Sequence, residues 1–257
     1  MFSFIINAIK IIFLLGFLII IHEGGHFLVA KLCKVKVNEF SIGFGKTLWK
    51  KQGKETLYSI RLIPLGGFVQ MEGENEESED KRAFSNVSIP KRIAIVSAGA
   101  IVNIVFGILV YFMLVSTVGL QFVDPAKDTF VNRIYYGGIQ TKEFIYSLFE
   151  SVKMLFTNGL SADQMTGPVG ISQIVVQTTT LSNYIYILSL ISVSLGITNL
   201  LPIPALDGGK IVLLLIEAIT RKKIKVETEA VITMIGFVLI IGLALYVTYH
   251  DVIRILN

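Results

Sequence analysis

The sequence predicts an α-helical polytopic membrane protein. We expect four transmembrane helices, a membrane-reentrant β-hairpin or small sheet, and an interfacial amphipathic helix. The first observation is composition: 53% of the 257 residues are hydrophobic and 16% are charged, whereas a soluble domain carries about 25% charged residues. The second is a mean hydropathy of +0.69. The third is a series of apolar runs of membrane-spanning length, separated by basic loops.

The charge of the chain points to a lipid partner. The net charge is +4 and the pI is about 9.0, which in a membrane protein indicates basic loops facing anionic lipid. No stretch interleaves aromatic and basic residues as a nucleic-acid surface does, so the lipid bilayer is the predicted partner and nucleic acid is not. The only cysteine is Cys33, which excludes an intrachain disulfide.

The first span is predicted at residues 4–30, and it contains His22-Glu23-Gly24-Gly25-His26. On a helix, His22 and His26 lie one turn apart on one face and can bind one metal ion, while Glu23 can reach a water molecule on that metal. The same pattern also occurs by chance, and a single histidine in an apolar segment is often a core residue. Three ionisable side chains inside a membrane span are costly without a metal, which favours a functional site.

Residues 31–61 are strongly basic, so this side of the membrane is predicted to be cytoplasmic and the N-terminus external. Alternating residues and glycine-rich turns predict a β-hairpin region at 35–70. Its second run is apolar enough to enter the membrane, although an ordinary surface sheet is an alternative that the sequence leaves open. The acidic run from Glu72 to Asp80 predicts a solvated loop.

The second span is predicted at 93–115, and an external amphipathic segment at 140–175 is expected to lie in the membrane interface. The Gly167-Pro168-Val169-Gly170 stretch is expected to break that helix.

A third span, at 184–219, is predicted to be broken at 199–209, where two prolines remove amide donors and Asp207 places a carboxylate at membrane depth. A basic loop at 221–225 then predicts a cytoplasmic turn. The last span, at 230–249, brings the C-terminus outside.

Taken together, these motifs resemble the site-2 protease family of intramembrane zinc metalloproteases, in its bacterial sigma-factor-regulating branch. The matching stretches occur in family order along the whole chain. They are His22–Phe27, Ala30-Lys31, Glu39–Gly45, Pro64–Val69, Gly99–Asn103, Gly167–Gly170 and Asn199–Gly208.

The resemblance implies a role for each site residue. It makes His22, His26 and Asp207 the ligands of a Zn²⁺ cofactor and Glu23 the base that activates water. It also implies that Asn199, in the N-x-x-P-x-P-x-L-D-G pattern, holds the substrate backbone.

The same resemblance makes the stretch around 57–70 a membrane-reentrant hairpin whose edge pairs with unwound substrate. We therefore expect a free strand edge that includes Ile60 and Leu62 and ends at Gly66 and Gly67. An apolar strand edge at membrane depth would otherwise leave amide groups unpaired.

The family branch normally carries a PDZ domain between its second and third spans. About 65 residues separate those spans here, fewer than a PDZ domain requires, so residues 1–257 are predicted to form a single metalloprotease domain without one. The predicted location is the bacterial inner membrane, with the active site towards the cytoplasm.

The predicted partner is a single-span membrane protein substrate, such as an anti-sigma factor or a signal peptide remnant. A zinc transporter or channel, and an inactive adaptor that binds membrane segments, are the alternative functions. The complete set of His22, Glu23, His26 and Asp207 favours the protease over both.

Overall fold

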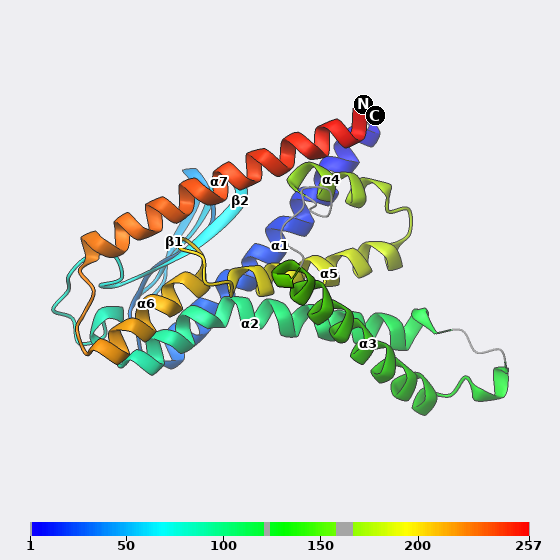
Figure 1. Cartoon of the computed structure of the whole chain (residues 1–257), viewed down its shortest axis with the longest axis horizontal. Helices are drawn as coiled ribbons and strands as arrows, with labels where there is room; N and C mark the ends of the chain where they lie inside the picture. Colours follow the sequence, from blue (N-terminus) through cyan, green and yellow to red (C-terminus); the bar gives the residue numbers. More distant parts are fainter. Residues whose placement is uncertain (1, 121–123, 158–166, 257) are drawn as a thin grey trace. The chain divides into compact units, whose positions relative to one another are not determined.

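The computed structural model describes residues 2–120, 124–157 and 167–256 (Figure 1). In chain order, the α-helices in these ranges are α1 (Phe2–Leu32), α2 (Ile89–Leu114), α3 (Phe130–Thr157), α4 (Pro168–Gln177), α5 (Leu181–Asn199), α6 (Asp207–Thr220) and α7 (Val226–Leu256). The strands β1 (Val37–Gln52) and β2 (Leu57–Met71) lie between α1 and α2 in the sequence.

Two compact units make up the chain. The first comprises Met1–Ile104 and Ser194–Ile240, and the second comprises Val105–Val193 and Ile241–Asn257. Helices α2, α5 and α7 each contribute to both units. The single domain expected over residues 1–257 stays a prediction. All residues of the candidate metal site belong to the first unit.

Four helices of the described chain are long and apolar enough to cross a membrane, which confirms the predicted number of spans. They are Ile5–Leu32, Ile89–Gly119, Leu181–Asn199 and Val226–Arg254. The third of these helices ends at Asn199 and α6 begins separately at Asp207, so the chain between them is non-helical at the place where the third span was predicted to be broken.

The segment between the second and third spans is helical where it is described. Helix α3 begins at Phe130, ahead of the predicted start at 140. Pro168 lies in the first turn of α4, where its missing N–H and fixed φ are tolerated, so the predicted break is also the start of another helix. The buried carboxylate of Asp251 accepts hydrogen bonds from the backbone N–H groups of Gly167 (3.0 Å) and Gly170 (2.8 Å).

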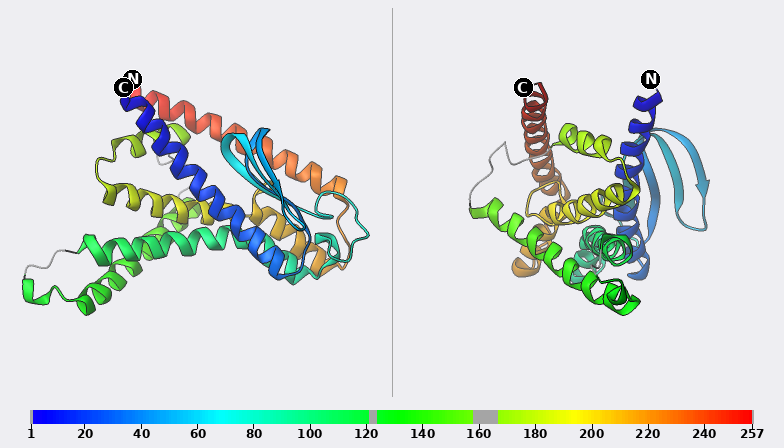
Figure 2. Two further views of the ribbon diagram at one scale, coloured as in Figure 1. Left: turned by 180° about the vertical axis from the view of Figure 1, so that it is seen from behind. Right: turned by 90° about the vertical axis from the view of Figure 1, so that its right-hand side faces the viewer.

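The two strands form the predicted hairpin beside α1 (Figure 2). They pair antiparallel, and each strand bends sharply along its length. The register places Glu39 opposite both Leu57 and Gln70, and Ile42 opposite both Ile60 and Gly67. The first half of β1 therefore lies between the two halves of β2.

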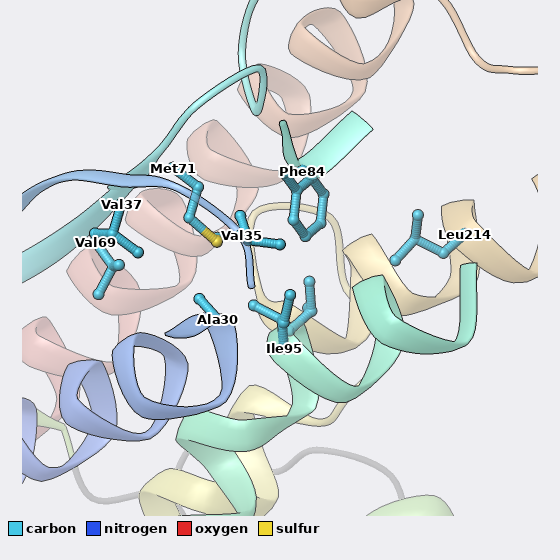
Figure 3. Close-up of a cluster of buried hydrophobic side chains, with 9 residues drawn as sticks. Ala30, Val35, Val37, Val69, Met71, Phe84, Ile95 and Leu214 are labelled. Atoms are coloured by element: carbon cyan, nitrogen blue, oxygen red, sulfur yellow. The ribbon is translucent and has the colours of Figure 1, made fainter. Parts of the chain in front are cut away.

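A cluster of buried side chains joins α1, the strands, α2 and α6 (Figure 3). Its members are Ala30, Val35, Val37, Val69, Met71, Phe84, Ile95, Val96 and Leu214. Burying such side chains contributes about 1.5–3 kcal/mol for each large one. The cluster fixes the C-terminal end of α1 against the end of β2, next to the histidines.

A buried ion pair ties α2 to α6. The Arg92 guanidinium donates two hydrogen bonds to the Glu217 carboxylate, and both side chains are about nine-tenths buried. A charge left alone in this position would be strongly unfavourable, so the pair holds α6 in one place against α2. Since Asp207 is the first residue of α6, the pair also constrains that carboxylate.

Candidate metal centre

Three potential metal ligands converge in the first unit. The Nε2 atoms of His22 and His26 are 3.2 Å apart, and they lie 3.3 and 3.5 Å from the Oδ2 atom of Asp207. All three ligand atoms lie within 4.8 Å of one another. The side chains retain only 12%, 11% and 20% of their exposure, so the group is largely shielded from bulk solvent.

Local sequence explains how each ligand reaches the centre. His22 and His26 are one turn apart on α1, as the helical repeat requires. Asp207 comes from the C-terminal part of the chain. Pro202 and Pro204 interrupt the helical run after α5, so a new helix, α6, begins at Asp207. Helix α6 then starts with the aspartate in its first turn, where a carboxylate also interacts favourably with the helix dipole.

The donor set fits a cation. The Nδ1 atom of His26 lies 2.8 Å from the backbone carbonyl of Ile95. A carbonyl only accepts, so Nδ1 carries the hydrogen, and in the neutral form of the ring this leaves the lone pair on Nε2, the nitrogen that lies in the centre. Within the described chain, the buried Oδ2 of Asp207 has no hydrogen-bond donor. Lone pairs that converge in this way are stabilised by a metal ion, and nitrogen with carboxylate oxygen suits zinc.

The predicted base, Glu23, lies on the wall of the same cavity. This cavity has a volume of about 220 Å³. Its lining contains the three ligands and the C-terminal end of β2. The lining residues are His22, Glu23, His26, Gly67, Phe68, Val69, Met71, Glu74, Val96, Asp207 and Lys210. A Cβ atom added to Gly67 would lie 3.0 Å from Cγ of Glu23, so the strand backbone passes directly beside that side chain.

The structure corrects the predicted strand edge. Ile60 is opposite Ile42 on one side and Trp49 on the other, so the expectation that it lies at a free edge is wrong. The bend of β1 causes this, because it places the second half of β1 on the outer side of the Leu57–Ile60 segment. Segment Gly67–Met71 pairs with β1 alone among the described residues.

Only part of the predicted substrate-binding set reaches the cavity. Gly67 lines it, whereas Gly66, Leu62 and Asn199 are not in its lining. Asn199 is the half-buried last residue of α5. The role of these residues in binding substrate stays a prediction.

Two charged residues of the cavity, Glu74 and Lys210, were not among the predicted site residues. Glu74 belongs to the acidic run that predicted a solvated loop, and it lines the metal cavity instead. Hydrogen bonds from Asn38, Ser78 and Lys36 anchor this loop at the neighbouring Glu72, and they lower the pKa of that carboxyl to about 2. In the sequence, the feature that could have identified Lys210 as a residue of the site is its position about one helical turn after Asp207.

Close packing around the ligands depends on glycine at position 99. A Cβ atom on Gly99 would collide with the His26 ring at Nε2, the atom that faces the metal position. We expect Gly99→Ala to displace this ring and lower zinc affinity by about 10- to 100-fold, the range for disturbed ligand orientation. Zinc content after dialysis against a buffered free-zinc series measures the change.

Gly24→Ala is the matched control for that variant. Gly24 lies between the ligands on α1, yet an added Cβ there meets no atom within 4 Å, so we expect undiminished zinc affinity. Equal affinity of both variants and the wild type would show that the Gly99 contact does not position His26.

Comparison with known proteins gives consistent matches. The sequence model of the family described as peptidase family M50 matches residues 10–243. A Clostridium acetobutylicum protein assigned as a zinc metalloprotease is 30% identical over 336 positions, which cover 98% of this chain and 98% of the relative. One from Synechocystis, with the same assignment, is 26% identical and covers 98% of this chain and 96% of its own.

A third protein with this assignment, from Vibrio cholerae, is 48% identical over 124 aligned positions, which cover 46% of this chain and 27% of the relative. The 336 positions aligned with the Clostridium protein exceed the 257 residues of this chain. That relative therefore contains inserted residues that this chain lacks.

Proposed function

The chain belongs to peptidase family M50, the site-2 proteases, and we propose that it is a zinc-dependent endopeptidase that cleaves single-span transmembrane substrates within the membrane. Family membership and the four apolar helices make it a multi-pass membrane metalloprotease. The observation that carries the finer proposal is the convergence of His22, His26 and Asp207 beside Glu23, on the wall of one cavity.

His22, His26 and Asp207 would hold the zinc. Their two imidazole nitrogens and one carboxylate oxygen leave coordination positions open, as catalytic zinc sites do. Bound there, zinc would supply Lewis acidity that polarises the scissile carbonyl and makes water more acidic. The hydrogen bond from His26 to the Ile95 carbonyl keeps the imidazole in the tautomer that this role needs.

Glu23 acts as the general base in this proposal. Its carboxylate takes a proton from water as the water oxygen attacks the peptide carbonyl carbon. The proton then passes to the amide nitrogen as the C–N bond breaks, which gives a carboxylic acid and an amine. Glu23 is outside the group of three ligands, so its carboxylate stays available for the proton.

The free edge of β2 offers a place for the substrate backbone. N–H groups of alternate residues in a strand point to opposite edges. The N–H of Glu72 points to the β1 side, where it bonds the Lys36 carbonyl. By this alternation the N–H groups of Gly67, Val69 and Met71 belong to the opposite edge of the strand, and all three residues line the cavity that contains the ligands.

A transmembrane substrate must unwind before it is cut, because its carbonyls are engaged in helical hydrogen bonds. Pairing with the outward-facing groups of Gly67 and Val69 would replace some of those bonds. Substrates with glycine or proline in their span should then be cut faster, because these residues weaken a helix by about 1 and 3 kcal/mol.

The proposed pairing predicts that Val69→Pro slows cleavage by roughly three- to tenfold, the effect of one lost hydrogen bond. Proline removes the outward donor but is tolerated at a strand edge. The measurement is the initial rate of cleavage of a single-span peptide in proteoliposomes. Val69→Ala is the control, since it also removes the branched valine side chain but keeps the N–H. Equal rates for the two zinc-loaded variants would exclude pairing at this residue.

We further propose that the protein lies in the bacterial inner membrane with its active site towards the cytoplasm, and that its substrate is an anti-sigma factor or a signal peptide remnant. Contacts within the first unit support the proposal that the basic loops lie on the same side of the membrane. Lys223 donates a hydrogen bond to the Ser85 carbonyl, and Glu55 pairs with both Lys31 and Arg82. The loops that carry these residues therefore lie together.

This topology predicts that a cysteine at position 50, in a chain with Cys33 replaced by serine, reacts with an impermeant maleimide in inverted vesicles. In intact cells, where the reagent reaches the external side alone, we expect no labelling. Labelling in intact cells would reverse the proposed orientation.

A further inference from the structure

Two charged residues connect the metal cavity to its neighbours. Glu74 and Lys210 line the metal cavity, a second cavity of about 350 Å³ and a third of about 530 Å³. Both side chains are about four-fifths buried. Neither residue has a part in the catalytic roles proposed above, although both lie in the lining of the metal cavity.

The Glu74 carboxylate bridges a strand and a helix. Its Oε1 atom accepts a hydrogen bond from Nζ of Lys210 at 2.7 Å, and its Oε2 atom accepts one from the backbone N–H of Met71 at 3.4 Å. The Met71 N–H is the last of the outward-facing donors on the free edge of β2. A side chain of the protein itself therefore fills the end of the edge on which an extended substrate would pair.

Lys210 fixes the position of this carboxylate relative to the metal ligands. It lies three residues after Asp207 on α6, so the two side chains are neighbours on one face of the helix. The Lys210 ammonium is further restrained by Glu229 at 3.8 Å and by the Phe84 ring, whose centroid is 4.9 Å away. One turn of helix α6 therefore sets the distance between Asp207 and the Met71 end of the strand edge, which the Glu74 carboxylate occupies.

We propose that Glu74, held by Lys210, is a register stop for the substrate strand, an inference that rests on the function proposed above. A strand added to Gly67–Met71 can use the outward groups of Gly67 and Val69 but cannot extend past Met71, because Glu74 occupies that donor. The stop determines which substrate residue lies beside the ligands, and hence which peptide bond is cut. Glu74 and Lys210 are positioning residues in this scheme.

The scheme makes a specific prediction about cleavage position. Outward groups recur at every second residue of a strand, so a strand that slips past the stop moves by about two residues. Glu74→Ala and Lys210→Met should both add a second cut, about two residues from the first. We expect the ratio of the two products to change by roughly tenfold, which corresponds to 1.4 kcal/mol.

The test uses a synthetic single-span peptide of alternating leucine and alanine with a central glycine-proline pair, in which neighbouring bonds are chemically alike. Full-length, zinc-loaded protein in proteoliposomes cuts the peptide, and mass spectrometry locates each product end. Glu74→Gln keeps the side-chain length and an acceptor oxygen, so it should keep the single wild-type cut. Glu76→Ala, in the exposed part of the same loop, is the matched control and should do the same.

The outcomes separate this inference from the proposed function. If Glu74→Ala and Lys210→Met cut only at the wild-type bond, at whatever rate, the register stop is wrong while the protease assignment stands. If the zinc-loaded wild type cuts no membrane peptide, both proposals fail. Because the two substitutions remove the contact from opposite sides, one that fails to fold leaves the other as the test.

Discussion

Replacing Asp207 with asparagine or alanine is expected to remove zinc from the protein and to abolish proteolysis. Asp207 is the only ligand that comes from α6, and its loss leaves two histidines on α1. Loss of a ligand should weaken zinc binding by more than the roughly 10- to 100-fold that follows disturbance of a ligand's supporting contacts. The zinc-to-protein ratio after equilibration at fixed free zinc, together with the cleavage rate, measures this.

Two further variants make the result specific. His22→Ala should lose zinc equally, because it removes a ligand from the other helix. Glu229→Ala removes a carboxylate that lines the neighbouring cavity but is outside the ligand group, so it should keep its zinc. Asp207→Asn preserves the shape of the side chain, which separates loss of the ligand charge from loss of the fold. Full zinc content in both Asp207→Asn and His22→Ala would refute the proposed centre.

Glu23→Gln is expected to lower the cleavage rate by about 10²- to 10⁴-fold while zinc binding stays unchanged. General acid–base catalysis contributes a factor of this size. The amide has nearly the same shape as the carboxylate but cannot accept the proton from water. Because the ligand group contains His22, His26 and Asp207 without Glu23, the metal should remain bound.

The measurement pairs single-turnover cleavage of the same peptide with metal analysis of the same sample. Glu76→Gln makes the identical chemical change on an exposed loop and should cleave at the wild-type rate. Loss of zinc from Glu23→Gln would mean that Glu23 is a ligand. Wild-type activity with zinc retained would mean that another group is the base, and Glu74 is the other carboxylate in the cavity lining that is outside the ligand group.

The features of this protein that depend on local pattern are predictable from its sequence. The four spans follow from the length of the apolar runs, and the structure confirms their number. The pairing of His22 with His26 follows from the 3.6-residue repeat of a helix, which holds wherever the helix packs. Asp207 was recognisable because two prolines must interrupt the helix before it.

Which strand edge is free depends instead on how the strands pack in three dimensions. Alternation along Thr56–Val69 predicted a strand, but register depends on how far β1 bends back and on which segment packs against α1. That bend places Ile60 between two paired segments of β1 and leaves the edge at Gly67–Met71 free among the described residues. No local pattern specifies such a choice, because the free edge depends on which segments of the two strands come to lie side by side.

The roles of Glu74 and Lys210 were also decided by tertiary structure. In the sequence, they are 136 residues apart, and each belongs to a stretch with an ordinary explanation: an acidic loop and the first turn of a helix. The core around Val69 and Met71 brings the loop to α6, and the Arg92–Glu217 pair holds α6 in position to receive it. An ion pair of this kind depends on where two separate elements are packed, which the local sequence around either residue does not specify.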